Sequence, residues 1–349
     1  MTDRLSWIDR WRGFLILQIV AFHVLGAFIQ SGLDSADALL TVHRWIERYC
    51  VLAFFSLTGV VWNRKSSFRE FLIGKVRRLL IPYFVFGGFW AACFAALASR
   101  FHCAYVEEFS MVWWQPFASV LLCNGYPNGI GARVVNALWF LPSLFGVSLA
   151  YFAIDRVLPL RSAQLLLLLP LFAMREMLGG VDGPWGVDRI PYFLMFVIIA
   201  RWAIPRTPFS WVYAHRLGGV GLAIFFYAIA GASLLIRWCF GAMGVGAWSW
   251  VFVTMAMIAA SAIFAQAVQI RFLERVGRDS LGVLVLHKFP ILAFQAIPGM
   301  VAWVMGLVVG VRGAFALALV ALAVSVSCAV TEILRRCAPF LLGERKGGS

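Results

Sequence analysis

Arg12 and His23 lie in the first long apolar segment of the chain, eleven residues apart. Eleven residues make about three turns of helix, so both side chains share one face and His23 lies roughly 16 Å further along the axis. Ionisable groups within a membrane are costly and are by default candidates for a functional site. An imidazole can act as a general base near neutral pH, and a guanidinium can bind an anion. We therefore predict that Arg12 and His23 act in one site, the simpler alternative being a histidine bonded to a neighbouring helix.

A second group of candidates lies in 63–78, the most basic stretch of the chain. Lys75 and Arg78 are three residues apart, which places them on one helix face, with Arg77 beside them. Three neighbouring cations are suited to holding a phosphate-bearing ligand. For most charges of this stretch, an ordinary loop at the membrane surface is the alternative.

Three further residues could complete a polar cavity. His287 follows Ser280 by seven residues, about 20° off the same helix face. Trp139 lies in a Trp-Phe-Leu-Pro sequence and could line the cavity for an acceptor molecule. Packing within the bundle is about as plausible for His287, and at least as plausible for Trp139. Lys288 points about 100° away from His287 on an ideal helix, so we predict only that it reaches the membrane surface.

The composition is that of a membrane protein. Hydrophobic residues make up 62% of the 349 residues and charged residues 13%, and the mean hydropathy is +0.86. A soluble domain carries about 25% charged residues. We predict an all-α polytopic helical bundle, one membrane domain over 1–349, with about ten spans. The predicted spans are 13–30, 45–62, 79–98, 138–155, 163–179, 190–204, 217–238, 248–268, 280–299 and 313–334.

The basic residues indicate the orientation of the chain and argue against a nucleic-acid partner. The net charge is +14, and most of the 30 lysine and arginine residues lie in the segments that are inside when the N-terminus is inside. This is the positive-inside pattern of a multi-pass membrane protein. We predict both termini on the cytoplasmic side of a cell inner membrane, and the longest outer loop over about 99–137.

Known cofactor motifs are missing from the sequence. The seven cysteines are scattered without a C-x-x-C spacing, and the chain has no P-loop, no G-x-G-x-x-G after a strand and no H-E-x-x-H. We therefore predict no metal site and no tightly bound cofactor.

Four elements together resemble one family. They are the 8–13 sequence running to His23, the Phe-Phe-Ser-Leu-Thr-Gly of 54–59 followed by 75–83, the Leu-Trp-Phe-Leu-Pro of 138–142, and Gly-Arg-Asp-Ser-Leu-Gly of 277–282 running to His287. In this order they resemble the acyltransferase-3 family of membrane O-acyltransferases, particularly short members similar to fucose 4-O-acetylases. The family's R-x-x-R element has Lys75 in place of its first arginine here.

The resemblance implies an enzyme that transfers an acyl group, commonly acetyl, from acyl-CoA to a hydroxyl of a sugar, polysaccharide or glycolipid. It implies His23 and Arg12 as the catalytic residues. The donor would be held by Arg12, Lys75, Arg77 and Arg78, and the acceptor by Trp139, Ser280 and His287. Acyl-CoA is then a co-substrate, and the partners are the acceptor and membrane lipid. The sequence leaves open whether His23 is a general base or carries the acyl group covalently.

A secondary transporter or lipid-linked sugar flippase is the alternative function, because it would also place ionisable groups inside a helical bundle. Many transporters contain internal repeats. No such similarity between the halves of this chain is visible, which favours the enzyme.

Overall fold

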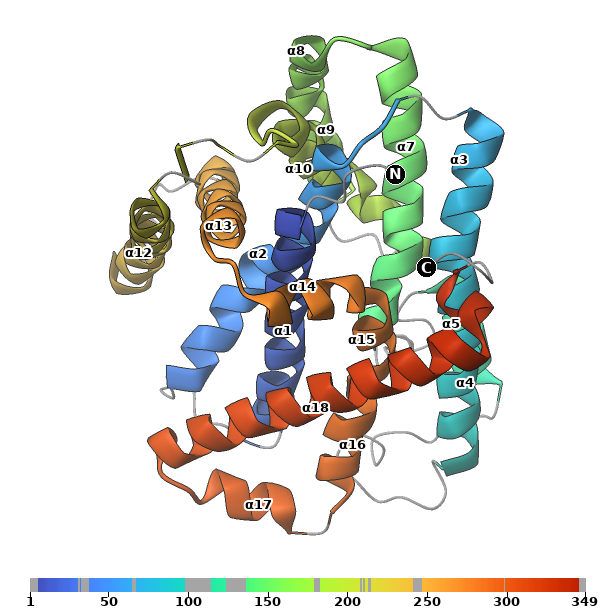
Figure 1. The fold of residues 1–349 in the computed structure, drawn as a ribbon, viewed down its shortest axis with the longest axis vertical. Helices are drawn as coiled ribbons and strands as arrows, with labels where there is room; N and C mark the ends of the chain where they lie inside the picture. The colour runs from blue at the N-terminus through green and yellow to red at the C-terminus, as the bar shows by residue number, and fades with distance from the viewer. Residues whose placement is uncertain are drawn as a thin grey trace.

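The structure is a computed structural model in which every regular element of the described residues is a helix. Figure 1 shows α1 near the centre, α14 lying across it and α18 running obliquely past its far end. The residues described are 6–30, 32, 38–64, 67–97, 114–123, 136–178, 183–207, 209, 211–212, 215–240, 247–297 and 299–344.

The elements follow the predicted apolar segments closely. All ten predicted spans fall on helical segments, some of them broken or joined. The α-helices are α1 (Ser6–Gln30), α2 (Ala38–Val60), α3 (Phe68–Lys75), α4 (Ile81–Leu97), α5 (Gln115–Leu122), α7 (Phe140–Val157), α8 (Arg161–Gln164), α9 (Leu168–Met177), α10 (Ile190–Ala203), α12 (Arg216–Phe240), α13 (Ala247–Ala267), α14 (Arg271–Arg278), α15 (Ser280–Leu286), α16 (Lys288–Ala296), α17 (Met300–Met305) and α18 (Val309–Cys337). The shorter helical turns are η1 (Val76–Leu80), η2 (Asn136–Trp139), η3 (Leu165–Leu167), η4 (Pro184–Arg189) and η5 (Pro339–Leu342).

The chain is an all-helical membrane bundle, and the structure does not confirm all ten predicted spans. Within the described residues, three helices are long and apolar enough to cross a membrane: Ser6–Ile29, Ala137–Val157 and Val309–Cys337. The bent pair Val251–Ala267 and Arg271–Arg278, with 119° between its halves, could make a fourth.

The structure adds detail to two predicted segments. The predicted span 280–299 is helical from Ser280 to Ala296, with a turn at His287 between α15 and α16. The predicted outer loop 99–137 contains α5, which has a proline in its first turn, a favourable position for that residue. Tyr83 of α4 donates a 2.5 Å hydrogen bond to the carbonyl of Val120 and so ties α5 to the bundle.

Glycines allow α1 and α14 to touch backbone to backbone. A Cβ on Gly277 would lie 1.7 Å from the carbonyl oxygen of Asp9, and one on Gly13 would lie 2.0 Å from that of Leu273. No side chain fits in either space. This crossing fixes the start of α15 relative to Arg12.

Arg10 fastens the same crossing through polar contacts. Its side chain is buried, its Nε donates to the carbonyl of Ala265 at 2.9 Å, and its Nη1 lies 2.6 Å from Oε1 of Glu274. Trp11, which is fully buried, donates from its indole nitrogen to Ser261 at 2.9 Å. Arg10 and Trp11 thus hold α1 against α13 and α14, which leaves the neighbouring Arg12 for another role.

Replacing Gly277 by alanine is expected to prevent correct packing of α1 on α14, because the added methyl group meets backbone that cannot move independently. Gly221→Ala on α12 is the matched control, since a Cβ there has open space. The control is expected to be neutral or stabilising by about 0.5–1 kcal/mol. Thermal stability of the two variants in detergent measures the difference. Equal stability would contradict the close contact.

Candidate active site

Two histidine rings meet inside the bundle. From the Gly13–Gly277 crossing, His23 lies ten residues further along α1, and His287 lies ten residues further along the other segment. Their ring centroids are 5.0 Å apart, with 31° between the ring planes. His23 is half-buried and His287 is fully buried. The structure therefore brings together the two histidines singled out in the sequence.

His287 has one free ring nitrogen. Nδ1 lies 2.9 Å from the carbonyl oxygen of Val283, a contact that requires Nδ1 to carry the proton. Nε2 is then an acceptor, and it is buried with no hydrogen-bond partner among the described residues. A buried polar atom without a partner is uncommon in proteins and is often explained by a functional role. Together with the adjacent His23, it makes this place a candidate binding site.

Lys288 and His43 also lie near His23. The ammonium of Lys288 is close enough to both His23 and His287 for its charge to act on the two rings. Lys288 is half-buried and has no carboxylate partner in the described part of the chain. His43 of α2 stacks on Phe22 with 4.2 Å between centroids and acts electrostatically on His23. Sequence reasoning missed both roles.

The cations predicted to hold a phosphate gather at the other end of the site. Burial, together with the positive charges of Arg78 and Arg12, lowers the pKa of Lys75 to about 8. Arg12, from α1, is therefore near Lys75 and Arg78, from a different part of the chain. Lys75 lies 5.6 Å from the centroid of the Phe71 ring and has no acidic partner among the described residues. Positive charges this close to Lys75 repel its ammonium, and an anion bound there would relieve that repulsion.

Arg77 and Arg78 lie in an unusual turn. The helix from Phe68 to Leu97 is continuous, but 76–80 forms a π-helical turn, η1. Such turns are rare and occur frequently at functional sites. Arg78 is exposed, whereas Nε of Arg77 is buried with no hydrogen-bond partner in the residues that the structure covers. The turn thus presents two guanidinium groups beside Lys75.

Arg12 is held in place by an acidic neighbour. Its Nη1 lies 3.7 Å from Oδ1 of Asp9, which is buried, while the Arg12 side chain is 37% exposed. The exposed part of the guanidinium can still contact a ligand. About 16 Å of helix axis separates Arg12 from His23. The cations and the imidazoles are therefore two groups at different heights along α1.

Ser280 and Trp139 do not join the two histidines. Ser280 is the first residue of α15, so about 10 Å of helix rise separates it from His287. Trp139 stacks on Phe193 at 6.2 Å, and the guanidinium of Arg189 lies 5.8 Å from its ring centroid. The structure gives neither residue a contact with His23 or His287.

The residues present are suited to acid–base and electrostatic chemistry. Within the described residues, no group of three or more His, Cys, Asp and Glu side chains is placed to hold a metal ion. An imidazole that can take up a proton lies beside an ammonium group that can stabilise developing negative charge. This combination suits transfer of an acyl group to a hydroxyl.

Comparison with known proteins identifies the family of the chain. Neither the curated proteins nor the solved structures gave a significant match. A family model described as an acyltransferase domain, that of the acyltransferase-3 family, matches residues 5–331, nearly the whole chain. The chain therefore belongs to the acyltransferase-3 family and is a membrane acyltransferase.

Proposed function

We propose that this protein transfers an acyl group, in the first instance acetyl, from acyl-CoA to a hydroxyl of a sugar, polysaccharide or glycolipid at the cell inner membrane. The observation that carries the proposal is that α1 contributes a residue to both groups of candidate side chains. Arg12 lies by Lys75 at one end, and the His23 ring lies 5.0 Å from that of His287 further along the same helix. A donor with an anionic head and a long uncharged arm fits this separation.

The donor end suits coenzyme A. Its phosphates would contact Arg12, Lys75, Arg77 and Arg78, and its pantetheine arm would extend along α1 toward His23. Guanidinium groups bind phosphate with two parallel hydrogen bonds, and an ammonium binds it as a point charge. With both termini cytoplasmic, as the distribution of basic residues predicts, these cations face the compartment in which acyl-CoA is made.

At the reacting end, His23 takes the proton of the acceptor hydroxyl as its oxygen attacks the thioester carbonyl. A C–O bond forms and a tetrahedral oxyanion develops. The C–S bond then breaks, and the proton passes to the departing thiolate, so that the products are an ester and free coenzyme A. His23 could instead carry the acyl group between two such steps. The ammonium of Lys288 stabilises the oxyanion in either route.

Release of the coenzyme A thiol from acetyl-CoA by the purified protein in lipid nanodiscs tests this function. Release should require an acceptor, and mass spectrometry of cell-surface glycans with and without the chain should identify the lost ester. A transporter would instead show saturable solute uptake into vesicles without acyl-CoA. Uptake with no thiol release from any acyl-CoA would contradict the proposal.

Donor binding is expected to weaken as pH rises through about 8, the lowered pKa of Lys75 in the free protein. Lys75 carries its charge below that pH and loses it above, so the contact with a phosphate is present only on the acid side. The loss should reach about tenfold in affinity, the scale of one charge-assisted hydrogen bond. Binding of acetyl-CoA, measured by calorimetry on both sides of this pH, gives the profile.

Lys75→Arg is the matched variant, since a guanidinium stays charged over this range. Its affinity should stay level where that of the wild type falls. An identical fall in both proteins would show that Lys75 does not contact the donor.

A further inference from the structure

Segment Pro339–Glu344, which follows α18, lies directly on the π-helical turn η1. Leu342 is buried and Gly343 adopts φ +69°. A Cβ on Gly343 would lie 2.4 Å from the carbonyl oxygen of Arg77 and 2.8 Å from Cα of Arg78. Position 343 therefore requires glycine for two reasons: the positive φ angle, and the lack of room for a Cβ beside η1. We call 339–344 the clasp segment.

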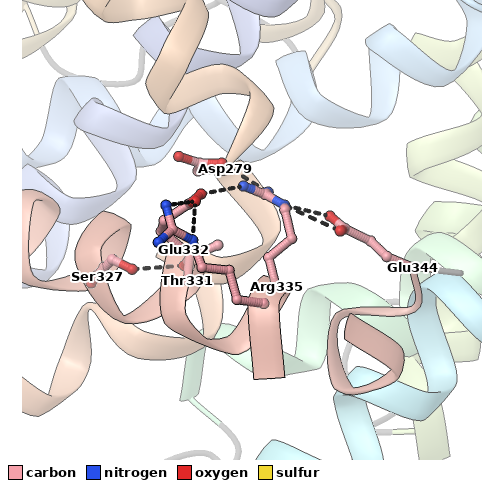
Figure 2. Close-up of polar contacts among 7 residues, drawn as sticks. Asp279, Ser327, Thr331, Glu332, Arg335 and Glu344 are labelled. Atoms are coloured by element: carbon pink, nitrogen blue, oxygen red, sulfur yellow. Dashed lines mark hydrogen bonds and ion pairs between the residues drawn. The ribbon is translucent and has the colours of Figure 1, made fainter. Parts of the chain in front are cut away.

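A polar network holds the clasp segment in place (Figure 2). Nε of Arg335 lies 3.2 Å and 3.1 Å from the two carboxylate oxygens of Glu344, and Nη2 lies 2.9 Å from Oδ1 of Asp279. Arg335 is on α18, and the buried Asp279 joins α14 to α15. One guanidinium thus ties the clasp segment to the junction that precedes α15.

The network joins the two parts of the chain that supply the proposed donor cations. Asp279 follows Gly277, which touches the backbone of α1 at Asp9. Glu344 follows Gly343, which touches the backbone of Arg77. The donor cations come from two separate parts of the chain, α1 and η1, and this chain of contacts fixes one relative to the other. The family match ends at residue 331, so the clasp segment lies outside it.

The π-helical turn needs such support. Its hydrogen bonds are wider than those of an α-helix and the form is seldom stable alone. Pro82, which follows it, has no backbone N–H and crowds the carbonyl of Arg78. A turn with these features is held by what packs against it: α7 packs on η1, and Gly343 touches its backbone at Arg77 and Arg78.

We infer that the clasp segment is a positioning element for donor binding: Gly343, Glu344, Arg335 and Asp279 hold η1 so that Arg77 and Arg78 face the phosphates of acyl-CoA. The inference rests on the proposed function for its ligand. None of the four residues touches the reacting atoms. Loosening the clasp should therefore raise the KM for acyl-CoA and leave kcat almost unchanged.

Glu344→Gln and Gly343→Ala test the inference, and Glu332→Gln is the matched control. Glu332 also contacts Arg335, at 3.4 Å, but its closer contact is with Arg336 at 2.9 Å, away from η1. We expect the first two variants to raise the KM for acetyl-CoA about tenfold, which is in the usual range for the coupling between two sites of one protein. The control should have the KM of the wild type. Glu344→Gln keeps the backbone unstrained and remains informative if Gly343→Ala fails to fold.

Hydrogen exchange of the amides of 76–81 gives a second readout that needs no ligand. These amides should exchange faster in Glu344→Gln and at the wild-type rate in Glu332→Gln. Unchanged KM and unchanged exchange in Glu344→Gln would overturn the inference. A fall in kcat together with a fall in thermal stability would also overturn it, because that result indicates general loss of structure. If the wild type itself does not bind acyl-CoA, the proposed function fails, and faster exchange alone would still support the clasp.

Discussion

His23→Ala is expected to lower acyl transfer by roughly 10²–10⁴-fold, the usual contribution of a positioned acid–base group. The reason is that the attacking hydroxyl then loses the proposed acceptor of its proton. His287 does not replace it, because its Nε2 is fully buried and its Nδ1 is bonded to Val283. Release of the coenzyme A thiol, followed with saturating acetyl-CoA and acceptor, measures the effect.

Binding of acetyl-CoA should survive this substitution, because the donor cations lie about 16 Å of helix away. Retained binding separates lost chemistry from lost folding. His215→Ala is the control histidine, since His215 is exposed just before α12 and its ring nitrogen Nδ1 lies 3.3 Å from the carbonyl of Trp211. Wild-type transfer in folded His23→Ala would end the proposed mechanism. Intact-mass analysis after acetyl-CoA without acceptor distinguishes a covalent acyl-histidine from a general base.

Lys288→Met should lower kcat by about 10²-fold with little change in KM for the donor, because the ammonium acts on charge that develops only during reaction. The variant removes the charge and preserves most of the volume. Its effect should be largest on the step that forms the tetrahedral oxyanion. Steady-state kinetics with acetyl-CoA, varied at saturating acceptor, separates kcat from KM.

Lys288→Arg keeps a cation and should recover part of the lost kcat. Arg206→Met, at an exposed position, is the control for loss of a positive charge and should leave both constants unchanged. A wild-type kcat in Lys288→Met would show that the charge of Lys288 does not reach the reacting carbonyl.

The fold class and the shared helix face of Arg12 and His23 could be predicted from sequence because both are local properties. Apolar runs of about 20 residues predict membrane helices, and each predicted run is helical in the structure. The whole-turn spacing of Arg12 and His23 needed only a regular helix, and α1 is regular over both. The count of ten spans stays a prediction, since apolar helices shorter than a bilayer give the same sequence signal as spanning ones.

Lys288 shows the limit of an argument made from one helix alone. Its predicted direction, about 100° from His287, says nothing about the neighbouring helices. In the structure α1 packs against α15 and α16, and the charge of Lys288 acts on both His23 and His287. Ser280 and His287 share a helix face by angle, although their separation along the axis keeps them apart.

The sequence by itself determined where Arg12 and His23 lie along the axis of α1 and that they share a face. Helix geometry converts their spacing directly into these positions. Only the tertiary structure decided which residues from other helices meet them: His287, Lys288 and His43 at His23, and Lys75 at Arg12. Those meetings depend on where helices cross, and here the crossings are set by contacts between distant backbones, such as Gly277 on Asp9 and Gly343 on Arg77. No local pattern encodes such a pairing, since each glycine is compatible with many partners until the chain has folded.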